Sequence, residues 1–393
     1  MVPSHLSLAD EPALARSEHL ASVIREEISR AGGRLEFDRY MNLALNAPGL
    51  GYYRAPMRRF GEGGDFITAP ELSPLFSRCV ARQIVDILSR AGNGEVLEVG
   101  AGSGRLCAGL LNALDELGQA PVHYRILEPS ADLRARQQST IETEARDFRE
   151  RVSWVNDLPS AGFKGVIIAN EMLDALPVRR FRISNGRVEE AFVEWRRGGF
   201  QWCFDSSRDG MPEATVADIE QALGKPLPQH YVSELGPQRG AWIQRAAAGL
   251  ERGALLLFDY GYPLTEYYHP QRVDGTLRCF LRHRSHDDPF LYPGLQDISV
   301  HVEFTSLATA ATEAGLEIGG FTTQAEFLLA SGLLEMCSDV DPRSERFFLL
   351  TRQIKRLTLP EEMGELIKVV AFTRKIGLPM EGFSGRDLRN LLA

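Results

Sequence analysis

The middle of the chain alternates short apolar runs with stretches of helical periodicity. The apolar runs lie at 95–99, 123–128, 152–155, 165–169 and 253–259. Between them, residues 104–117, 130–148 and 237–250 repeat apolar side chains at helical spacing. Short apolar strands that are separated by helices are typical of a mostly parallel sheet with helices on both faces. The pattern therefore predicts an α/β fold.

The segments around this alternation follow other patterns. Residues 17–30 have the periodicity of a helix, and Thr68–Glu71 resembles a capping box that opens a long helix to about Ser89. Two alternating runs flank Asn185-Gly186, which predicts an antiparallel hairpin within 178–204. Near the end we expect a helix over 302–314 and a closing strand over 345–352.

These patterns predict the division of the chain. We expect a helical N-terminal region over residues 1–90, which helps to cover a site as a lid, and one large α/β core over 91–393. Two insertions interrupt that core, an antiparallel one at about 178–235 and a loop-rich one at about 262–300.

Composition and charge narrow the function classes. The chain has 393 residues, of which 44% are hydrophobic and 25% charged, as in ordinary globular proteins. Its net charge of −9 argues against a protein that grips nucleic-acid phosphates. The five cysteines are scattered without a C-x-x-C pair, so neither a disulfide framework nor a metal site is predicted. The absence of a signal sequence and of a long apolar stretch leads us to expect a cytoplasmic protein without stable membrane insertion.

A glycine-rich turn carries the strongest chemical signal. Gly100, Gly102 and Gly104 follow the strand at 95–99 and open the next helix. Glycines there let the backbone approach a ligand that a Cβ would obstruct. The spacing departs from the G-x-G-x-x-G fingerprint of dinucleotide sites because Arg105 occupies the sixth position. The form E-x-G-x-G-x-G, with Glu98 at its start, is the one that methyltransferases use for S-adenosylmethionine.

Polar residues end the other predicted strands. Glu128 can accept hydrogen bonds from a ribose diol, and Asn156 and Asp157 can contact an adenine ring. Asn170 and Glu171 end the fourth strand, where the sheet edge faces the group to be transferred. Together with the glycine turn, these positions predict a site for S-adenosylmethionine.

Several longer segments resemble the MidA-type methyltransferases, a family that includes the mitochondrial protein arginine methyltransferase supporting assembly of respiratory complex I. The similar segments are FGEGGDFITAPELSPLF (60–76), VLEVGAGSGRL (96–106), ILEPS (126–130), IIANEMLDALPV (167–178), LLFDYG (256–261), GTLRCFLRH (275–283) and PGLQDISVHVEFTSL (293–307). The resemblance covers nearly the whole chain.

The resemblance implies a class I Rossmann-like methyltransferase fold, with a seven-stranded sheet whose seventh strand is antiparallel to the rest. It also implies symmetric dimethylation of an arginine on a protein partner, a complex I subunit. By position, Glu98 and the three loop glycines correspond to the family's cofactor loop, and Glu128 to its ribose acid. Asn170, Glu171 and Asp174 correspond to the motif after the fourth strand.

The chemistry of methyl transfer suggests roles for these last residues. Carboxylates paired to a guanidinium would orient it and take the released proton. We expect Glu171 to form that clamp, Asp174 to support it and Asn170 to hold the edge of substrate or cofactor. The alternatives are that Asp174 caps a short helix and that Glu171 lies behind the residues that contact the substrate.

Other residues have weaker signals. Asp65 ends a glycine-rich loop and either closes over the cofactor or orders that loop through an Asx turn. Tyr52 and Tyr53 either line a substrate groove or pack in the core, and Asp297 and His301 are candidates for shaping the site. His283 and His286, near Asp287 and Asp288, resemble a metal cluster, but two neighbouring arginines disfavour a cation.

Three other functions stay open at this point. The chain could methylate a different protein residue or a small molecule. It could be an assembly factor that keeps the cofactor fold without catalysis. A nicotinamide-dependent dehydrogenase is disfavoured by the glycine spacing.

Overall fold

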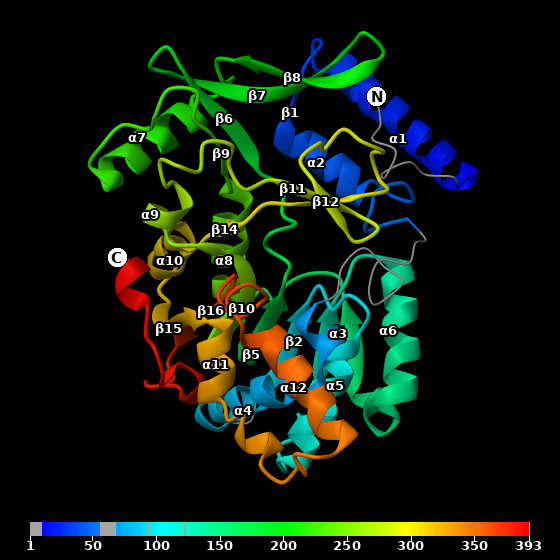
Figure 1. Ribbon diagram of the computed structural model, residues 1–393, viewed down its shortest axis with the longest axis vertical. Coiled ribbons are helices and arrows are strands. Elements are labelled where there is room, and N and C mark those ends of the chain that lie inside the picture. The colour runs from blue at the N-terminus through cyan, green and yellow to red at the C-terminus, as the bar shows by residue number, and fades with distance from the viewer. Residues whose placement is uncertain (1–9, 56–67, 93, 122, 393) are drawn as a thin grey trace. The chain divides into compact units, whose positions relative to one another are not determined.

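The structure is a computed structural model that describes residues 10–55, 68–92, 94–121 and 123–392 (Figure 1). The chain divides into two compact units by its internal contacts. Unit 1 takes its residues from 1–66, 174–239 and 262–303, and unit 2 from 67–173, 240–261 and 304–393. The predicted boundary at residue 90 stays a prediction, although the contacts group residues 68–92 with unit 2.

Unit 2 is built on a path of seven strands in the order β15-β16-β10-β5-β2-β3-β4. Their bounds are β2 (Glu95–Val99), β3 (Tyr124–Leu127), β4 (Val152–Val155), β5 (Phe163–Asn170), β10 (Leu250–Tyr262), β15 (Glu317–Thr323) and β16 (Ile367–Arg374). Strands β2, β3, β4, β5 and β10 are parallel, whereas β16 is antiparallel to β10 and β15. This topology confirms the expected class I methyltransferase fold with its antiparallel seventh strand.

Helices accompany this sheet. They are α3 (Ala69–Leu72), α4 (Pro74–Ala91), α5 (Arg105–Glu116), α6 (Ala131–Glu144), α8 (Pro237–Gly249), α10 (Phe304–Glu313), α11 (Gln324–Ala330) and α12 (Glu345–Thr358). Short 3-10 turns lie at η2 (Arg146–Arg151), η3 (Glu335–Cys337), η4 (Glu381–Phe383) and η5 (Arg389–Leu392). The crossovers α5 and α6 connect successive parallel strands, as the sequence pattern predicts.

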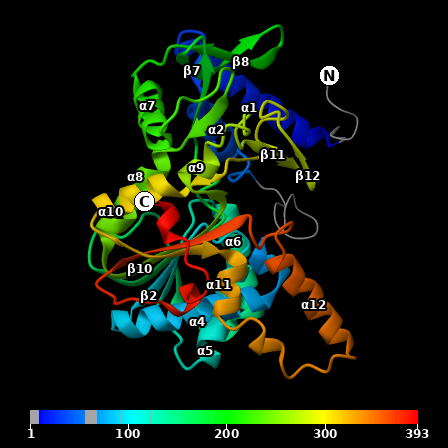
Figure 2. The ribbon, with the colours of Figure 1, turned by 60° about the vertical axis from the view of Figure 1, so that its left-hand side comes forward.

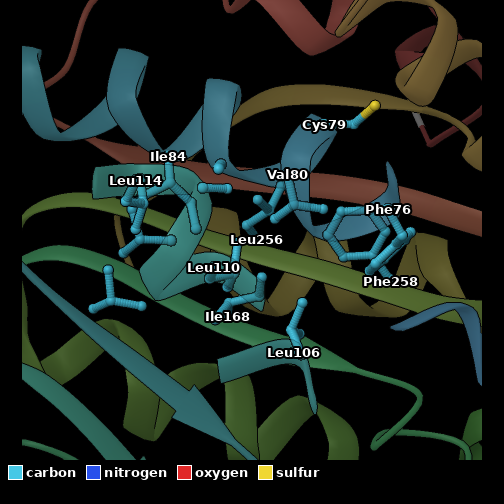
Figure 3. Packing of buried hydrophobic residues seen from close by; sticks show 14 of the residues in the cluster. Phe76, Cys79, Val80, Ile84, Leu106, Leu110, Leu114, Ile168, Leu256 and Phe258 are labelled. Atoms are coloured by element: carbon cyan, nitrogen blue, oxygen red, sulfur yellow. The ribbon is translucent and has the colours of Figure 1, made fainter. Parts of the chain in front are cut away.

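The core of unit 2 lies between α4, α5 and one face of the sheet (Figure 3). Ile84 of α4 and Leu110 of α5 pack there with Ile168 of β5 and Leu256 of β10, and all four side chains are buried. The neighbouring positions in β5 and β10, such as Ile167, are buried as well. Because successive side chains of a strand point to opposite faces, both faces of the sheet are covered.

Two of the expected elements differ in the structure. Residues 345–352 belong to α12 and not to a closing strand, because Ser344 caps a helix whose last residue is Thr358. The Ser344 hydroxyl accepts a hydrogen bond from Phe347 N at 3.2 Å. The capping box at Thr68 is also wrong, since Thr68 makes no side-chain cap and the helix is interrupted. Ser73 caps α4 instead, accepting from Leu75 N at 3.2 Å.

Unit 1 contains two antiparallel sheets. The larger follows the order β1-β7-β6-β9 with β8 paired to β7, and the smaller the order β12-β11-β13. The strands are β1 (Leu35–Glu36), β6 (Arg179–Ser184), β7 (Arg187–Arg196), β8 (Gly199–Asp205), β9 (Val232–Leu235), β11 (Arg278–Leu281), β12 (Arg284–His286) and β13 (Asp297–Ser299); β14 (Val302–Glu303) follows. The predicted hairpin is confirmed as β6 and β7.

Four helices belong to unit 1. They are α1 (Glu11–Arg30), α2 (Phe37–Asn46), α7 (Met211–Leu223) and α9 (Leu264–Tyr267). Helices α1 and α2 pack beside β7 (Figure 2). Leu20 and Ile24 of α1 share a buried cluster with Phe37 and Tyr40 of α2 and with Val193 of β7. The predicted N-terminal helix is therefore confirmed as a packed element of this unit.

The packing of Ile168 predicts a large loss of stability when its side chain is shortened. Ile168 is fully buried in the cluster of Figure 3, so Ile168→Ala removes buried methyl groups and leaves a cavity. We expect the free energy of unfolding in urea to fall by about 2–5 kcal/mol. The control is Leu117→Ala, whose side chain is 44% exposed and which should change stability by less than about 0.5 kcal/mol. Equal losses in the two variants would contradict the assigned core.

Candidate functional site

The glycine turn lies between β2 and α5 in unit 2 and adopts a conformation that favours glycine. Gly100, Gly102 and Gly104 have φ angles of 72°, 53° and 88°, in the left-handed region. A Cβ on Gly104 would lie 3.0 Å from the Cα of Gln137. The expectation that this turn follows a strand and opens a helix is confirmed. Its bare backbone can approach a ligand closely.

Gln137 of α6 fixes this turn to the neighbouring strands. Its Nε2 donates to Gly102 O at 3.1 Å and to Glu128 Oε2 at 3.3 Å. Its Oε1 accepts from the indole N–H of Trp154 in β4 at 2.8 Å. The side chain is fully buried. One amide therefore couples the glycine turn, the acid after β3 and the strand β4.

Glu128 lies at the carboxyl end of β3, where the sequence predicts a ribose-binding acid. The side chain is 4% exposed, and its Oε1 accepts a hydrogen bond from Ser130 N at 2.9 Å. Arg134 holds the surrounding backbone by donating to the carbonyl oxygens of Glu128 and Val155. It also donates to Asn156 Oδ1 at 2.7 Å. Arg134 thus links Glu128 and Asn156 at the edge of the sheet. Their contacts with a cofactor stay a prediction.

Asp157 and Glu98 have contrasting environments. Asp157 is exposed after β4, next to Asn156. Glu98 is 2% exposed inside β2 and accepts a hydrogen bond from the Tyr124 hydroxyl at 2.6 Å. Burial raises the pKa of Glu98 to about 7, and the Tyr124 hydrogen bond opposes that rise. Glu98 therefore supports the strand from which the glycine turn emerges, and its predicted part in the cofactor loop stays a prediction.

Asn170 and Glu171 end β5, next to β2 in the sheet. The Asn170 Nδ2 donates to Glu171 Oε1 at 3.2 Å. The Asn170 Oδ1 is buried and has no hydrogen-bond partner among the described residues. A buried acceptor without a donor is costly, so this oxygen is suited to a ligand that brings an N–H or O–H group. The pair offers acceptor atoms from both residues at the edge of the sheet.

A second carboxylate shapes the backbone around this pair. Glu171 has a φ of 49°, which is uncommon for a residue with a Cβ. Its N–H donates to Phe258 O at 2.8 Å. Asp259 Oδ2 accepts from the next two backbone N–H groups, Met172 at 3.1 Å and Leu173 at 2.8 Å. The buried side chain of Asp259 therefore replaces the partners that a continuing strand would supply.

Asp174 belongs to unit 1, although it follows Glu171 by only three residues. Its Oδ2 accepts from the Ser299 hydroxyl at 3.1 Å, and its backbone oxygen accepts from Val300 N at 3.0 Å. The described residues 171–178 form bends and turns but no helix, so the alternative role of Asp174 as a helix cap does not hold. Its predicted support of the acceptor site stays a prediction.

The remaining candidates have separate positions. Asp65 and the loop FGEGGD lie outside the described residues. Tyr52 is fully buried against Tyr53, whose hydroxyl donates to Asp297 Oδ1 at 2.8 Å. The His301 ring lies 5.4 Å from that of Tyr262. In the described part of the chain, no three histidine, cysteine or acidic side chains are arranged to hold a metal ion.

Sequence reasoning missed three residues that organise the site. Gln137 and Arg134 lie within an ordinary polar helix, where no motif distinguishes them from exposed neighbours. Asp259 was part of the family-like segment LLFDYG, but its role as an acceptor for two backbone N–H groups depends on a distant turn. Only the position of Asp259 at the end of an apolar strand could have drawn attention to it.

The arrangement fits a nucleoside-type cofactor with hydroxyl and ammonium donors. The glycine turn follows β2 and Asn170 ends β5, and between these two adjacent strands the order of the sheet reverses. Ligands of open α/β sheets bind at such a point. Three left-handed glycines give a bare backbone, and the Asn170 Oδ1 has no donor within the described part of the chain. The residues present are therefore suited to S-adenosylmethionine.

Two solved structures are similar to this chain over nearly its full length. One, from Burkholderia thailandensis, is bound to S-adenosyl-homocysteine and is 41% identical, with a TM-score of 0.93 and coverage of 98% of this chain and 99% of that one. A native crystal structure from the same organism has 41% identity, a TM-score of 0.91 and the same coverage. The cofactor of this protein is S-adenosylmethionine, of which the homocysteine form is the demethylated product.

Curated relatives come from animals. The protein arginine methyltransferase NDUFAF7 homolog, mitochondrial, of Caenorhabditis elegans is 28% identical, with 82% of this chain and 80% of that protein covered. Its human counterpart is 26% identical, with 91% of this chain and 83% of that protein covered. These relatives are named as mitochondrial, and they contradict the prediction of a cytoplasmic protein. No described helix is long and apolar enough to span a membrane.

The bridging role of Gln137 predicts a loss of cofactor affinity when its amide is removed. Gln137→Leu leaves the Trp154 N–H without its acceptor and frees Glu128 and Gly102 from their shared donor. We expect the dissociation constant for S-adenosylmethionine, measured by calorimetry, to rise by about tenfold or more. Gln138→Leu is the matched control because Gln138 is the next residue of α6 and is exposed. An unchanged affinity in Gln137→Leu would show that the bridge does not organise the site.

A family model also matches most of the α/β unit. The model described as "Putative S-adenosyl-L-methionine-dependent methyltransferase" matches residues 79–322, more than half of the chain. This range includes the glycine turn, Glu128, the Asn170–Glu171 pair and Asp259. The fold, the site and the structure bound to S-adenosyl-homocysteine agree with it. The chain belongs to this MidA-type family and is an S-adenosylmethionine-dependent methyltransferase.

Proposed function

We propose that the protein is a protein arginine N-methyltransferase in which Asn170 and Glu171 receive the guanidinium group. The main support is the buried Asn170 Oδ1, to which no described residue donates, next to the carboxylate of Glu171. A guanidinium carries five N–H donors and no acceptor, so a site made of acceptors suits it. The curated relatives named as protein arginine methyltransferases support the same acceptor.

The reaction requires few groups from the protein. S-adenosylmethionine supplies an electrophilic methyl group on a sulfonium. A C–S bond breaks as a C–N bond forms, and the methylated nitrogen loses one proton. Glu171 would pair with the guanidinium, orient the attacking nitrogen and accept that proton. Asn170 would hold Glu171 through its Nδ2 and take one guanidinium N–H on its Oδ1. Most of the rate enhancement would then come from positioning.

The finer parts of the proposal concern the partner. We propose symmetric dimethylation of a protein substrate, with a subunit of respiratory complex I as the candidate, on the basis of the family resemblance. Asp174 would act in support of Glu171, since it follows Glu171 by three positions in the chain. Asp65, Glu98, Glu128, Asn156 and Asp157 are proposed to belong to the cofactor side of the site. The experiment below distinguishes this proposal from the alternative functions, which are methylation of another residue, methylation of a small molecule, and assembly without catalysis.

The proposed clamp predicts a selective loss of methyl transfer in Glu171→Gln. The change keeps the size of the side chain but removes its charge and its ability to accept a proton. We expect transfer of radiolabelled methyl groups into a lysate of a strain without the gene to fall by about 100-fold or more. The affinity for S-adenosylmethionine, measured by calorimetry, should change by less than about threefold, because the clamp faces the acceptor. Asn170→Ala should reduce the rate by about tenfold.

Two controls make this experiment decisive. Glu313→Gln alters an exposed glutamate of α10 and should leave both quantities unchanged. Mass spectrometry of the labelled band identifies the methylated residue and its methylation pattern. Methylated arginine supports the proposal, whereas label on another residue or in small molecules rejects arginine as the acceptor. Full activity in Glu171→Gln rejects the clamp, and the absence of label with every lysate rejects catalysis.

A further inference from the structure

Unit 1 contains a chain of hydrogen bonds between two buried carboxyl groups. The Ser299 hydroxyl lies 3.1 Å from Asp174 Oδ2 and 3.1 Å from Asp297 Oδ2. Asp297 accepts a further hydrogen bond at Oδ1 from the Tyr53 hydroxyl at 2.8 Å. Asp174 and Asp297 are 8% and 4% exposed. The four side chains therefore form one linear cluster inside the unit.

The number of protons in this cluster is limited by its geometry. A serine hydroxyl has one proton and can donate it to only one of its two carboxyl neighbours. If both aspartates were ionised, one Ser299–carboxylate contact would have no proton between its oxygens. A proton on one carboxyl group satisfies both contacts, because Ser299 then donates to one aspartate and accepts from the other. Two buried like charges linked by one hydroxyl would also repel each other.

The surroundings place this proton on Asp297. Burial raises the pKa of Asp174, but the Ser299 hydroxyl, the buried Arg239 and the backbone N–H groups at 174 and 175 oppose that rise. Burial and the neighbouring Asp174 raise the pKa of Asp297 to about 7. Among the described residues, Tyr53 and Cys279 also face the cluster, and both are neutral at that pH because burial raises their pKa. Tyr52 packs against Tyr53.

The cluster also anchors Asp174, which follows Glu171 by three positions in the chain. Ser299 holds the Asp174 side chain, and Val300 N donates to the Asp174 backbone oxygen at 3.0 Å. The Arg239 guanidinium fixes this strand end by donating to Val300 O at 2.6 Å and His301 O at 2.7 Å. Upstream, Asp259 holds the backbone of Met172 and Leu173. Asp174 is thus fixed within unit 1, and Met172 and Leu173 within unit 2.

We propose that Asp174 and Asp297 share one proton through Ser299, and that Asp297 and Ser299 are positioning residues for methyl transfer because they fix Asp174, the residue proposed to support Glu171. The positioning role rests on the function proposed for Asp174 and Glu171, whereas the shared proton does not. Loss of the proton leaves two charges on one hydroxyl and loosens the anchor of Asp174. The anchor is therefore intact below a pH of about 7 and is lost as the pH rises above it.

Asp297→Asn separates this proposal from a purely structural role. An asparagine can accept from Tyr53 with its Oδ1 and donate to Ser299 with its Nδ2, so it imitates the protonated aspartate at every pH. In the wild type, the rate of methyl transfer to a labelled lysate band should fall above pH 7, by about tenfold per pH unit if the ionised pair is inactive. The ratio of the Asp297→Asn rate to the wild-type rate should therefore rise with pH.

Ser299→Ala tests the link itself. Removal of the hydroxyl separates the two carboxyl groups, and we expect kcat to fall by about tenfold at pH 7 while the KM for S-adenosylmethionine stays within about twofold. The matched control is Ser206→Ala, an exposed serine of the same unit. A parallel pH profile for Asp297→Asn and the wild type, or an unchanged kcat in Ser299→Ala, would overturn the positioning role.

Infrared spectroscopy of the full chain tests the shared proton without any acceptor. At pH 6 the wild type should show a carboxylic acid C=O band that Asp297→Asn lacks. Glu98→Gln is the control because Glu98 is the other buried carboxyl group whose pKa is raised to about 7. A band that persists unchanged in Asp297→Asn overturns the proposal. If instead Glu171→Gln proves fully active while the band behaves as expected, the proposed function fails and the shared proton stands.

Discussion

The turn after β5 depends on one buried carboxylate. Parallel strands normally lead into a loop or helix whose first N–H groups need partners. Here Asp259, within the neighbouring strand β10, accepts from both Met172 and Leu173. With the Glu171 N–H bonded to Phe258 O, these contacts hold Glu171 in a left-handed conformation. A conformation that costs about 1–2 kcal/mol persists only because its surroundings determine it.

This backbone constraint explains why the side chains of Asn170 and Glu171 lie next to each other. A continuing strand would place Asn170 and Glu171 on opposite faces of the sheet, since side chains alternate along a strand. The left-handed residue interrupts that alternation, and the Asn170 amide reaches the Glu171 carboxylate at 3.2 Å. The Asn170 Nδ2 donates to Glu171, and the Asn170 Oδ1 can accept a hydrogen bond from a ligand. The backbone turn therefore determines the chemistry that the two side chains can offer.

The sequence predicts the parts of the fold that rest on local periodicity and glycine spacing. The parallel strands are short apolar runs, and the turn at Gly100–Gly104 needs left-handed φ angles that only glycine adopts readily. The strand predicted over 345–352 was wrong because the sequence FFLL is compatible with a strand as well as with a helix. The signal that distinguishes the helix is the N-cap at Ser344. The Asp174–Ser299–Asp297 cluster could not be foreseen, because its members lie 125 and 2 residues apart and no periodicity relates them.

Carboxyl groups in this molecule act in different ways according to what surrounds them. Asp259 accepts hydrogen bonds from three backbone N–H groups, those of Tyr260, Met172 and Leu173. Asp297 accepts from the hydroxyl groups of Tyr53 and Ser299 and from the backbone of Ile298, but burial and the neighbouring Asp174 outweigh these hydrogen bonds and raise its pKa to about 7. Asp259 fixes the backbone that follows Glu171 in unit 2, whereas Asp297 is linked to Asp174 through Ser299 in unit 1. In the second case a proton on one carboxyl group removes the repulsion between two buried negative charges.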